Sequence, residues 1–219
     1  MRYLILSIFF LLAPSLTLAD AIKDIQWIDL IPAEHRKDPL EHLPEEERDH
    51  VEWIVYLRQN LPEKITEEEK KFHQEMTEAI PKLKAKGIDV DKIIAKREKR
   101  DDSLNSELDG KRVRLPGYVL PLDVDGELLT EFLLVPYVGA CIHVPPPPRN
   151  QIVHATVKKP IERSFKQLFT PIQAVGVLKT TPMSKELFLM DGSDDVNIGY
   201  TMEIEVVEPY KPEQTKKGQ

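Results

Sequence analysis

The residues best suited to chemistry are Cys141, the only cysteine of the chain, and His143, two positions later. In an extended backbone, residues i and i+2 point to the same side, so the thiolate and the imidazole can converge on one point. Both groups are favoured ligands of zinc and copper. We therefore expect a transition-metal site, with zinc as the metal. Because two ligands do not make a site, we expect His154, on the strand that follows, to be the third ligand.

The segment after His143 has an unusual composition that allows two other interpretations. Four consecutive prolines, Pro145, Pro146, Pro147 and Pro148, form a stiff rod without amide donors. With Tyr137 they could line a metal-free groove for a peptide, a lipid or a protein partner. Asn150 and Gln151 could tie the exit of the rod with amide hydrogen bonds. The third interpretation is a thiol-dependent enzyme with the histidine as base, but the sequence shows no oxyanion donor for it.

The elements that must position these residues lie in the second half of the chain. Apolar residues alternate with polar ones, or run together, at 111–120, 130–137, 151–157, 172–178 and 200–207, which predicts five strands. Residues 164–169 could form a one-turn helix, and Gly176 would allow a bulge in the fourth strand. Five strands in this order predict a small OB-like antiparallel β-barrel over residues 106–210. Residues 191–195 (DGSDD) are expected to form a polar turn.

The first half of the chain is rich in charged residues, and its apolar residues recur at the intervals typical of helices. Helices are predicted near 45–59, 66–86 and 89–100, so residues 20–105 would form an N-terminal helical arm. Trp27 and Leu30 are expected to dock on the barrel. Trp53 and Tyr56 are expected to pack in the core of their helix and not to form a ligand platform. The overall fold class is therefore α+β.

The N-terminal residues predict where the protein is located. Arg2, the apolar run 4–12 and small residues ending at Ala19 predict a secretory signal peptide over residues 1–19, and hence a periplasmic protein without a transmembrane segment in its mature form. Residues 211–219 are expected to be a disordered tail. The 30 basic and 37 acidic residues give a net charge of −7, which argues against nucleic acid as a partner.

Residues 134–151 (LVPYVGACIHVPPPPRNQ) resemble the signature of an uncharacterised family of exported bacterial proteins with a domain of unknown function. Similar stretches are residues 109–122, 200–210 and the opening 27–32. The resemblance implies a gene placed beside an ABC transporter, in some cases linked to zinc supply. Together these observations predict a non-enzymatic periplasmic accessory protein that binds zinc and assists an inner-membrane ABC transporter. The alternatives are the metal-free groove and, third, the thiol enzyme.

Overall fold

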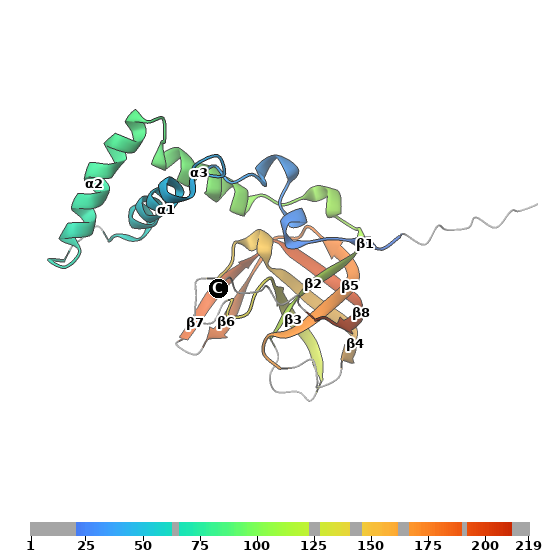
Figure 1. Cartoon of the computed structure of the whole chain (residues 1–219). Coiled ribbons are helices and arrows are strands. Elements are labelled where there is room, and N and C mark those ends of the chain that lie inside the picture. Colours follow the sequence, from blue (N-terminus) through green and yellow to red (C-terminus); the bar gives the residue numbers. More distant parts are fainter. Residues whose placement is uncertain are drawn as a thin grey trace, which may run out of the picture.

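The computed structural model describes residues 21–62, 66–122, 128–140, 146–161, 167–189 and 192–211. Three helices, α1 (Glu45–Asn60), α2 (Lys70–Ala85) and α3 (Val90–Asp102), extend to one side of a β-barrel (Figure 1). The expected signal peptide, residues 164–166 of the expected one-turn helix and the tail after Lys211 lie outside the described residues. Residues 167–169, the second half of that expected helix, form a turn before β5 and not a helix. Within the described ranges, no helix has both the length and the apolar character needed to cross a membrane.

The barrel consists of five strands: β2 (Arg112–Pro121), β3 (Leu129–Val135), β4 (Val153–Ile161), β5 (Thr170–Lys179) and β8 (Tyr200–Pro209). They pair in the order β2-β3-β4-β8-β5, and β5 pairs with β2 to close the barrel. The predicted α+β class and small barrel are confirmed. The prediction of an entirely antiparallel barrel is wrong for one pair, because β4 and β8 run parallel. A closed ring with an odd number of strands cannot alternate direction all the way round.

Side chains of alternate strand residues fill the barrel. Phe132 and Tyr200 are among the largest side chains that are fully buried there. The N-terminal segment belongs to this body: β1 (Lys23–Asp24) pairs with β2, and the 3-10 helix η1 (Trp27–Leu30) packs on the barrel core. Leu30 is completely buried, and Trp27 Nε1 donates a hydrogen bond of 2.7 Å to the carbonyl oxygen of Pro116. The predicted docking of this segment is confirmed.

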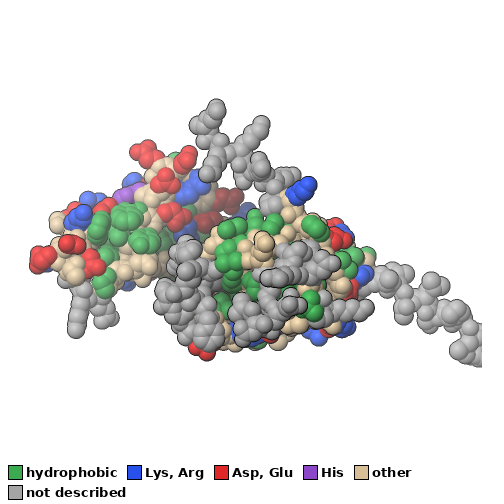
Figure 2. Space-filling view, turned by 90° about the horizontal axis from the view of Figure 1, so that it is seen from below, with side chains coloured by type: hydrophobic (Ala, Val, Ile, Leu, Met, Phe, Trp, Pro, Cys, Tyr) green, Lys and Arg blue, Asp and Glu red, His purple; other side chains and the backbone are tan. Residues whose placement is uncertain are grey.

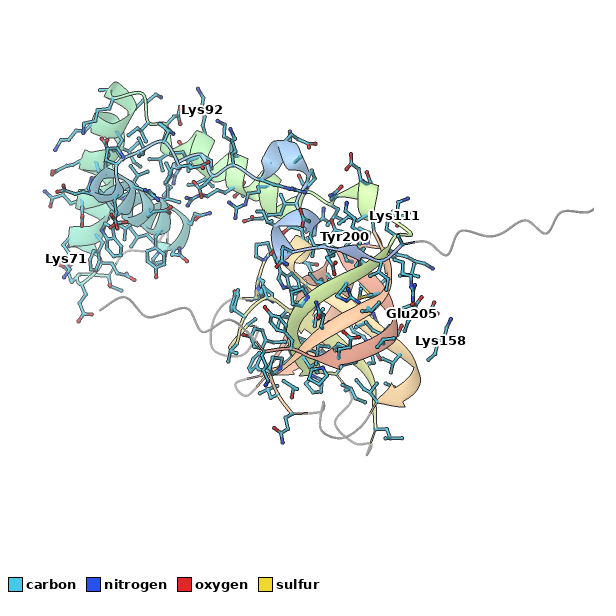
Figure 3. The ribbon with its side chains drawn as sticks, turned by 45° about the vertical axis from the view of Figure 1, so that its right-hand side comes forward. Lys71, Lys92, Lys111, Lys158, Tyr200 and Glu205 are labelled. Atoms are coloured by element: carbon cyan, nitrogen blue, oxygen red, sulfur yellow. The ribbon has the colours of Figure 1, made fainter. Side chains whose placement is uncertain are left out.

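The Tyr200 hydroxyl connects the barrel to both ends of the N-terminal half. It donates to the carbonyl oxygen of Leu30 and accepts from the amide of Asn105, each at 2.5 Å. Burial raises the pKa of Tyr200 to about 12, so this hydroxyl stays protonated and keeps its role as a donor at neutral pH. Figure 3 shows Tyr200 at the junction between the barrel and the segment that leads to the helices.

A hairpin that the sequence did not predict covers one outer face of the barrel. It consists of β6 (Met183–Leu189) and β7 (Gly192–Ile198). Leu187, Val196 and Ile198 of the hairpin pack on a cluster that includes Leu133 and Val135 of β3. The predicted polar turn is wrong for residues 192–195, which are part of β7. Pairing with β6 supplies the backbone hydrogen bonds that these polar residues need to form a strand.

The three predicted helices are confirmed, and they share a core of their own that is separate from the barrel. The prediction that Trp53 and Tyr56 pack in this core is wrong, since their side chains are 37% and 56% exposed. A helix with 3.6 residues per turn can turn only one face inward. In α1 that face carries a different set of side chains, namely Val51, Ile54, Val55 and Leu57.

Candidate functional site

The signature segment is described only in part. Cys141, His143 and Pro145 lie outside the described residues. Tyr137 is exposed, and Pro146 to Pro148 lead into the 3-10 helix η4 (Arg149–Gln151). Pro146 is exposed and Pro147 is buried, so these prolines do not all face one groove.

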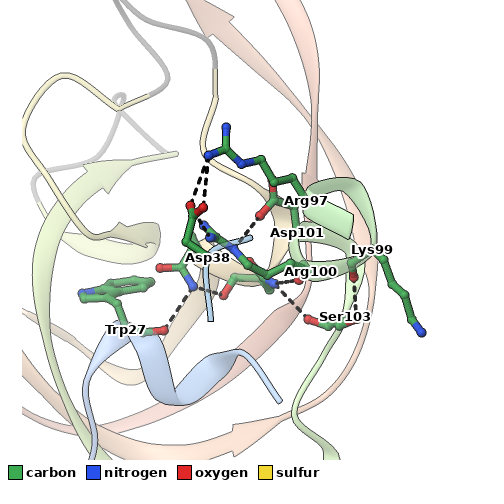
Figure 4. A network of polar contacts seen from close by, with 9 residues as sticks. Trp27, Asp38, Arg97, Lys99, Arg100, Asp101 and Ser103 are labelled. Carbon is green, nitrogen blue, oxygen red and sulfur yellow. Dashed lines mark hydrogen bonds and ion pairs between the residues drawn. The ribbon is translucent and has the colours of Figure 1, made fainter. Parts of the chain in front are cut away.

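The end of the signature segment holds the arm against the barrel. Asn150 is fully buried, and its Nδ2 donates to the carbonyl oxygens of Arg100 at 2.7 Å and Ser103 at 2.9 Å. Gln151 Nε2 donates to the carbonyl oxygen of Trp27 at 3.1 Å. Figure 4 shows these three accepting residues in one network. The predicted hydrogen bonds of the two amides at the exit of the proline rod are present, and their acceptors lie on the last turn of α3, on the residue that follows α3 and on η1.

Ion pairs also connect α3 to its neighbours. Two nitrogens of Arg97 contact the two carboxylate oxygens of Glu52 at 2.5 and 2.6 Å, and Arg97 also contacts Asp38 (Figure 4). Hydrogen bonds with Glu52 raise the pKa of Arg97, although burial works against this. Burial also opposes ionisation of Asp38, but the Leu40 amide and Arg97 outweigh it and lower the pKa of that carboxyl group. These ion pairs tie α3 to α1 and to Asp38, one helical turn before Arg100, the residue of α3 that Asn150 contacts.

His154, the third predicted metal ligand, lies under the β6–β7 hairpin. Its Nε2 is 2.5 Å from Glu131 Oε1, and burial lowers the pKa of His154. Lys185 Nζ contacts the same carboxylate oxygen and is 3.4 Å from His154 Nε2. The ammonium group of Lys185 thus occupies the place where Glu131 and His154 together would bind a metal ion. In the part of the chain that the structure describes, no three His, Cys, Asp or Glu side chains are grouped so as to hold a metal ion.

An open groove with a volume of about 620 Å³ lies at another place on the barrel. Four separate segments form it: the start of η1, the middle of β2, the residue after β3 and the two residues after β8. Its lining comprises three aromatic residues, two prolines and one charged residue, with a glutamine and a glycine: Trp27, Tyr118 and Tyr210; Pro116 and Pro136; Lys211; Gln26 and Gly117. The sequence predicted a groove of tyrosine and proline, but from Tyr137 and the proline rod and not from these residues.

The groove owes its shape to Gly117. A Cβ atom at this position would lie 2.9 Å from side-chain atoms of both Leu134 and Trp27, so glycine allows the indole to lie close against β2. The backbone of β2 offers little to a ligand at Pro116, because its nitrogen carries no hydrogen and its carbonyl oxygen already accepts from Trp27. A ligand here would be held by side chains and not by strand addition.

Comparison with known proteins places the chain in a family. A family model described as "Protein of unknown function (DUF3299)" matches residues 27–209. The chain is similar to the crystal structure of a DUF3299 family protein from Pseudomonas aeruginosa PAO1, with 27% identity, coverage of 88% of this chain and 99% of that chain, and a TM-score of 0.48. A comparison with curated proteins finds no match. On the extent of the family match, this chain belongs to the DUF3299 family.

Proposed function

We propose that this protein is an exported, periplasmic binding module without enzymatic activity, which holds a proline-containing segment of a partner protein. The observation that carries the proposal is the groove of Trp27, Tyr118 and Tyr210, with Pro116 and Pro136 between them. Export is proposed from the signal-peptide pattern of residues 1–19.

The chemistry of the groove fits a polyproline II ligand. Such ligands dock in aromatic-lined grooves, where the rings pack on pyrrolidine groups and hydroxyl donors meet the solvated carbonyl oxygens. Tyr118 and Tyr210 offer both rings and hydroxyl groups. Lys211 is the single charged lining residue, so the groove favours a neutral or acidic segment. The bonded backbone at Pro116 disfavours a ligand that would add a strand.

We also infer that the barrel is OB-like. Counted along the chain, β2, β3, β4, β5 and β8 are the first to fifth strands of the barrel. Around the ring they follow the order first-second-third-fifth-fourth, and the third (β4) and fifth (β8) are parallel. OB domains bind oligonucleotides and oligosaccharides on the face of strands two and three. Here the β6–β7 hairpin packs against that face, at Leu133 and Val135 of β3. This arrangement supports a ligand site elsewhere, and the net charge of −7 disfavours nucleic acid.

The groove can be tested with its own tryptophan as a reporter. The chain has two tryptophans, so Trp53→Phe leaves Trp27 as the only one. In this background we expect a decaproline peptide with acidic ends to change the indole fluorescence. Because Tyr210 is one of three aromatic rings in the groove, we expect Tyr210→Ala to weaken binding by about tenfold.

The matched control is Tyr137→Ala, since Tyr137 is exposed but does not line the groove. A glycine-serine peptide of equal length and charge controls for non-specific binding. If Tyr137→Ala abolished binding and Tyr210→Ala left it intact, the proposed groove would be wrong, and the site would be the loop predicted from the sequence.

Zinc binding by Cys141 and His143, in a protein that assists an ABC transporter, is our second candidate. One observation favours it. His154 is paired with Leu133 and follows Ile152 by two residues, so it shares a face with the cluster in which Ala140 is buried. Ala140 directly precedes Cys141. For His154 Nε2 to bind a metal ion, it would have to leave Glu131, and Lys185, 3.4 Å away, would have to move aside.

Elemental analysis of untagged protein purified from the periplasm tests this candidate. A zinc site predicts about one zinc per chain. Cys141→Ser and His143→Ala should each abolish it, whereas His73→Ala, at an exposed histidine of α2, should not. Protein that holds no metal and takes up none on titration with zinc would exclude the metal site without affecting the groove.

A further inference from the structure

The helical arm carries three aromatic side chains at its surface, of which only Phe72 also packs against the core of the arm. Trp53 and Tyr56 of α1 are 37% and 56% exposed. Their rings stack at a centroid distance of 5.7 Å, and Phe72 of α2 meets Trp53 edge-on at 5.8 Å. Figure 2 shows hydrophobic side chains gathered on a face of the arm, with acidic groups at its edge. We call Trp53, Tyr56 and Phe72 the arm aromatic surface.

This surface is already ordered before any partner arrives. Stacking fixes the two α1 rings against each other, and Trp53 Nε1 donates to Glu75 Oε1 at 3.1 Å. Aromatic side chains held in this way offer a large contact area and lose little conformational entropy on binding. The α1–α2 pair lies away from the barrel in Figure 1, so the barrel does not cover this part of the arm.

Two carboxylates beside the arm aromatic surface favour a positively charged ligand. Glu75 contacts Trp53, and the exposed Asp49 lies one helical turn before Trp53 on the same side of α1. The net charges of the two helices nearly cancel, because α1 has five acidic side chains and two arginines (2 − 5 = −3), whereas α2 has four lysines and two glutamates (4 − 2 = +2). The attraction for a cation therefore depends on the two carboxylates beside Trp53, those of Asp49 and Glu75. The surface also holds a cation of its own chain, since Lys71 Nζ lies 4.6 Å from the centroid of the Phe72 ring.

We propose that the arm aromatic surface is a second docking site, which binds arginine or lysine side chains of a partner protein. The faces of tryptophan and tyrosine attract a cation, and guanidinium groups stack well on them. Glu75 and Asp49 would add an attractive charge at the rim. The site is independent of the groove, because it lies on α1 and α2 and shares no residue with the groove lining.

The test uses the other single-tryptophan variant. Trp27→Phe leaves Trp53 as the only tryptophan, and its fluorescence is followed while a peptide of alternating alanine and arginine is added. We expect saturable binding, and Tyr56→Ala should weaken it roughly fivefold. Tyr56→Phe keeps the ring and should retain binding. Asp49→Asn combined with Glu75→Gln should reduce the affinity and its dependence on salt.

A peptide of alternating alanine and glutamate is the matched ligand control. Ile28→Ala, at an exposed apolar residue of η1 on the barrel, is the matched protein control. Equal binding of both peptides, or binding that Tyr56→Ala does not alter, would overturn the proposal. So would dimerisation of the intact protein that Tyr56→Ala abolishes, because the occupant would then be a second copy of the chain.

Discussion

Replacing Asn150 with aspartate is expected to lower the free energy of unfolding by about 3–5 kcal/mol at neutral pH. The two side chains have the same shape, so no cavity is formed. The amide that donates to the carbonyl oxygens of Arg100 and Ser103 would become a buried carboxylate facing two acceptors. Both hydrogen bonds would be lost, and the junction between α3 and the barrel would open.

The loss should depend on pH in a defined direction. Burial and the two carbonyl oxygens would raise the pKa of the introduced carboxyl group in the folded state. A group with a raised pKa binds its proton more tightly when folded, so the difference from wild type should shrink as the pH falls toward about 4. Denaturant unfolding at several pH values measures this. Asn197→Asp, at an exposed asparagine of β7, is the control, and equal stability of the two variants would contradict the role given to Asn150.

Gly176→Ala is expected to destabilise the barrel by about 2–4 kcal/mol. A Cβ atom at Gly176 would lie 2.2 Å from the carbonyl oxygen of Glu203 and 3.0 Å from Ile204 Cα. Both contacts are with the backbone of β8, which cannot rotate away as a side chain would. The register between β5 and β8 shifts at this residue, so the close approach belongs to a bulge that helps to close the barrel.

Thermal and denaturant unfolding measure this effect. Gln173→Ala, on the same strand and only partly buried, controls for the introduction of alanine into β5. If Gly176→Ala were as stable as Gln173→Ala, the backbone of β8 would have to be free to move, and the bulge would not be a fixed feature of the barrel.

The sequence by itself determined the features that follow from local spacing. Alternation in the last strand predicted β8, and glycine in the fourth strand predicted the bulge at Gly176. The apolar opening predicted that Trp27 and Leu30 dock on the barrel. The amide side chains after the proline rod predicted the hydrogen bonds of Asn150 and Gln151. In each case the signal lies within a few residues, where periodicity and side-chain chemistry act directly.

Other features depend on which distant segments meet. Glu131 and His154 come together because of the register between β3 and β4, which the sequence of neither strand specifies alone. The β6–β7 hairpin escaped prediction because its polar residues are stabilised by cross-strand pairing. The spacing of apolar residues in α1 likewise does not show which side of the helix its partner helices cover. The exposure of Tyr56 is therefore known only from the packing of the three helices.

The groove shows most clearly which features the sequence determines and which depend on the tertiary structure. The sequence contained every aromatic ring and proline that lines it, but these residues come from four segments between positions 26 and 211. Closure of the barrel places β5 between β8 and β2, so that Tyr210, directly after β8, and Tyr118 of β2 line the same groove. The rings were determined by the sequence. Their convergence on one groove was decided by the tertiary structure, because only long-range strand pairing brings Trp27, Tyr118 and Tyr210 together.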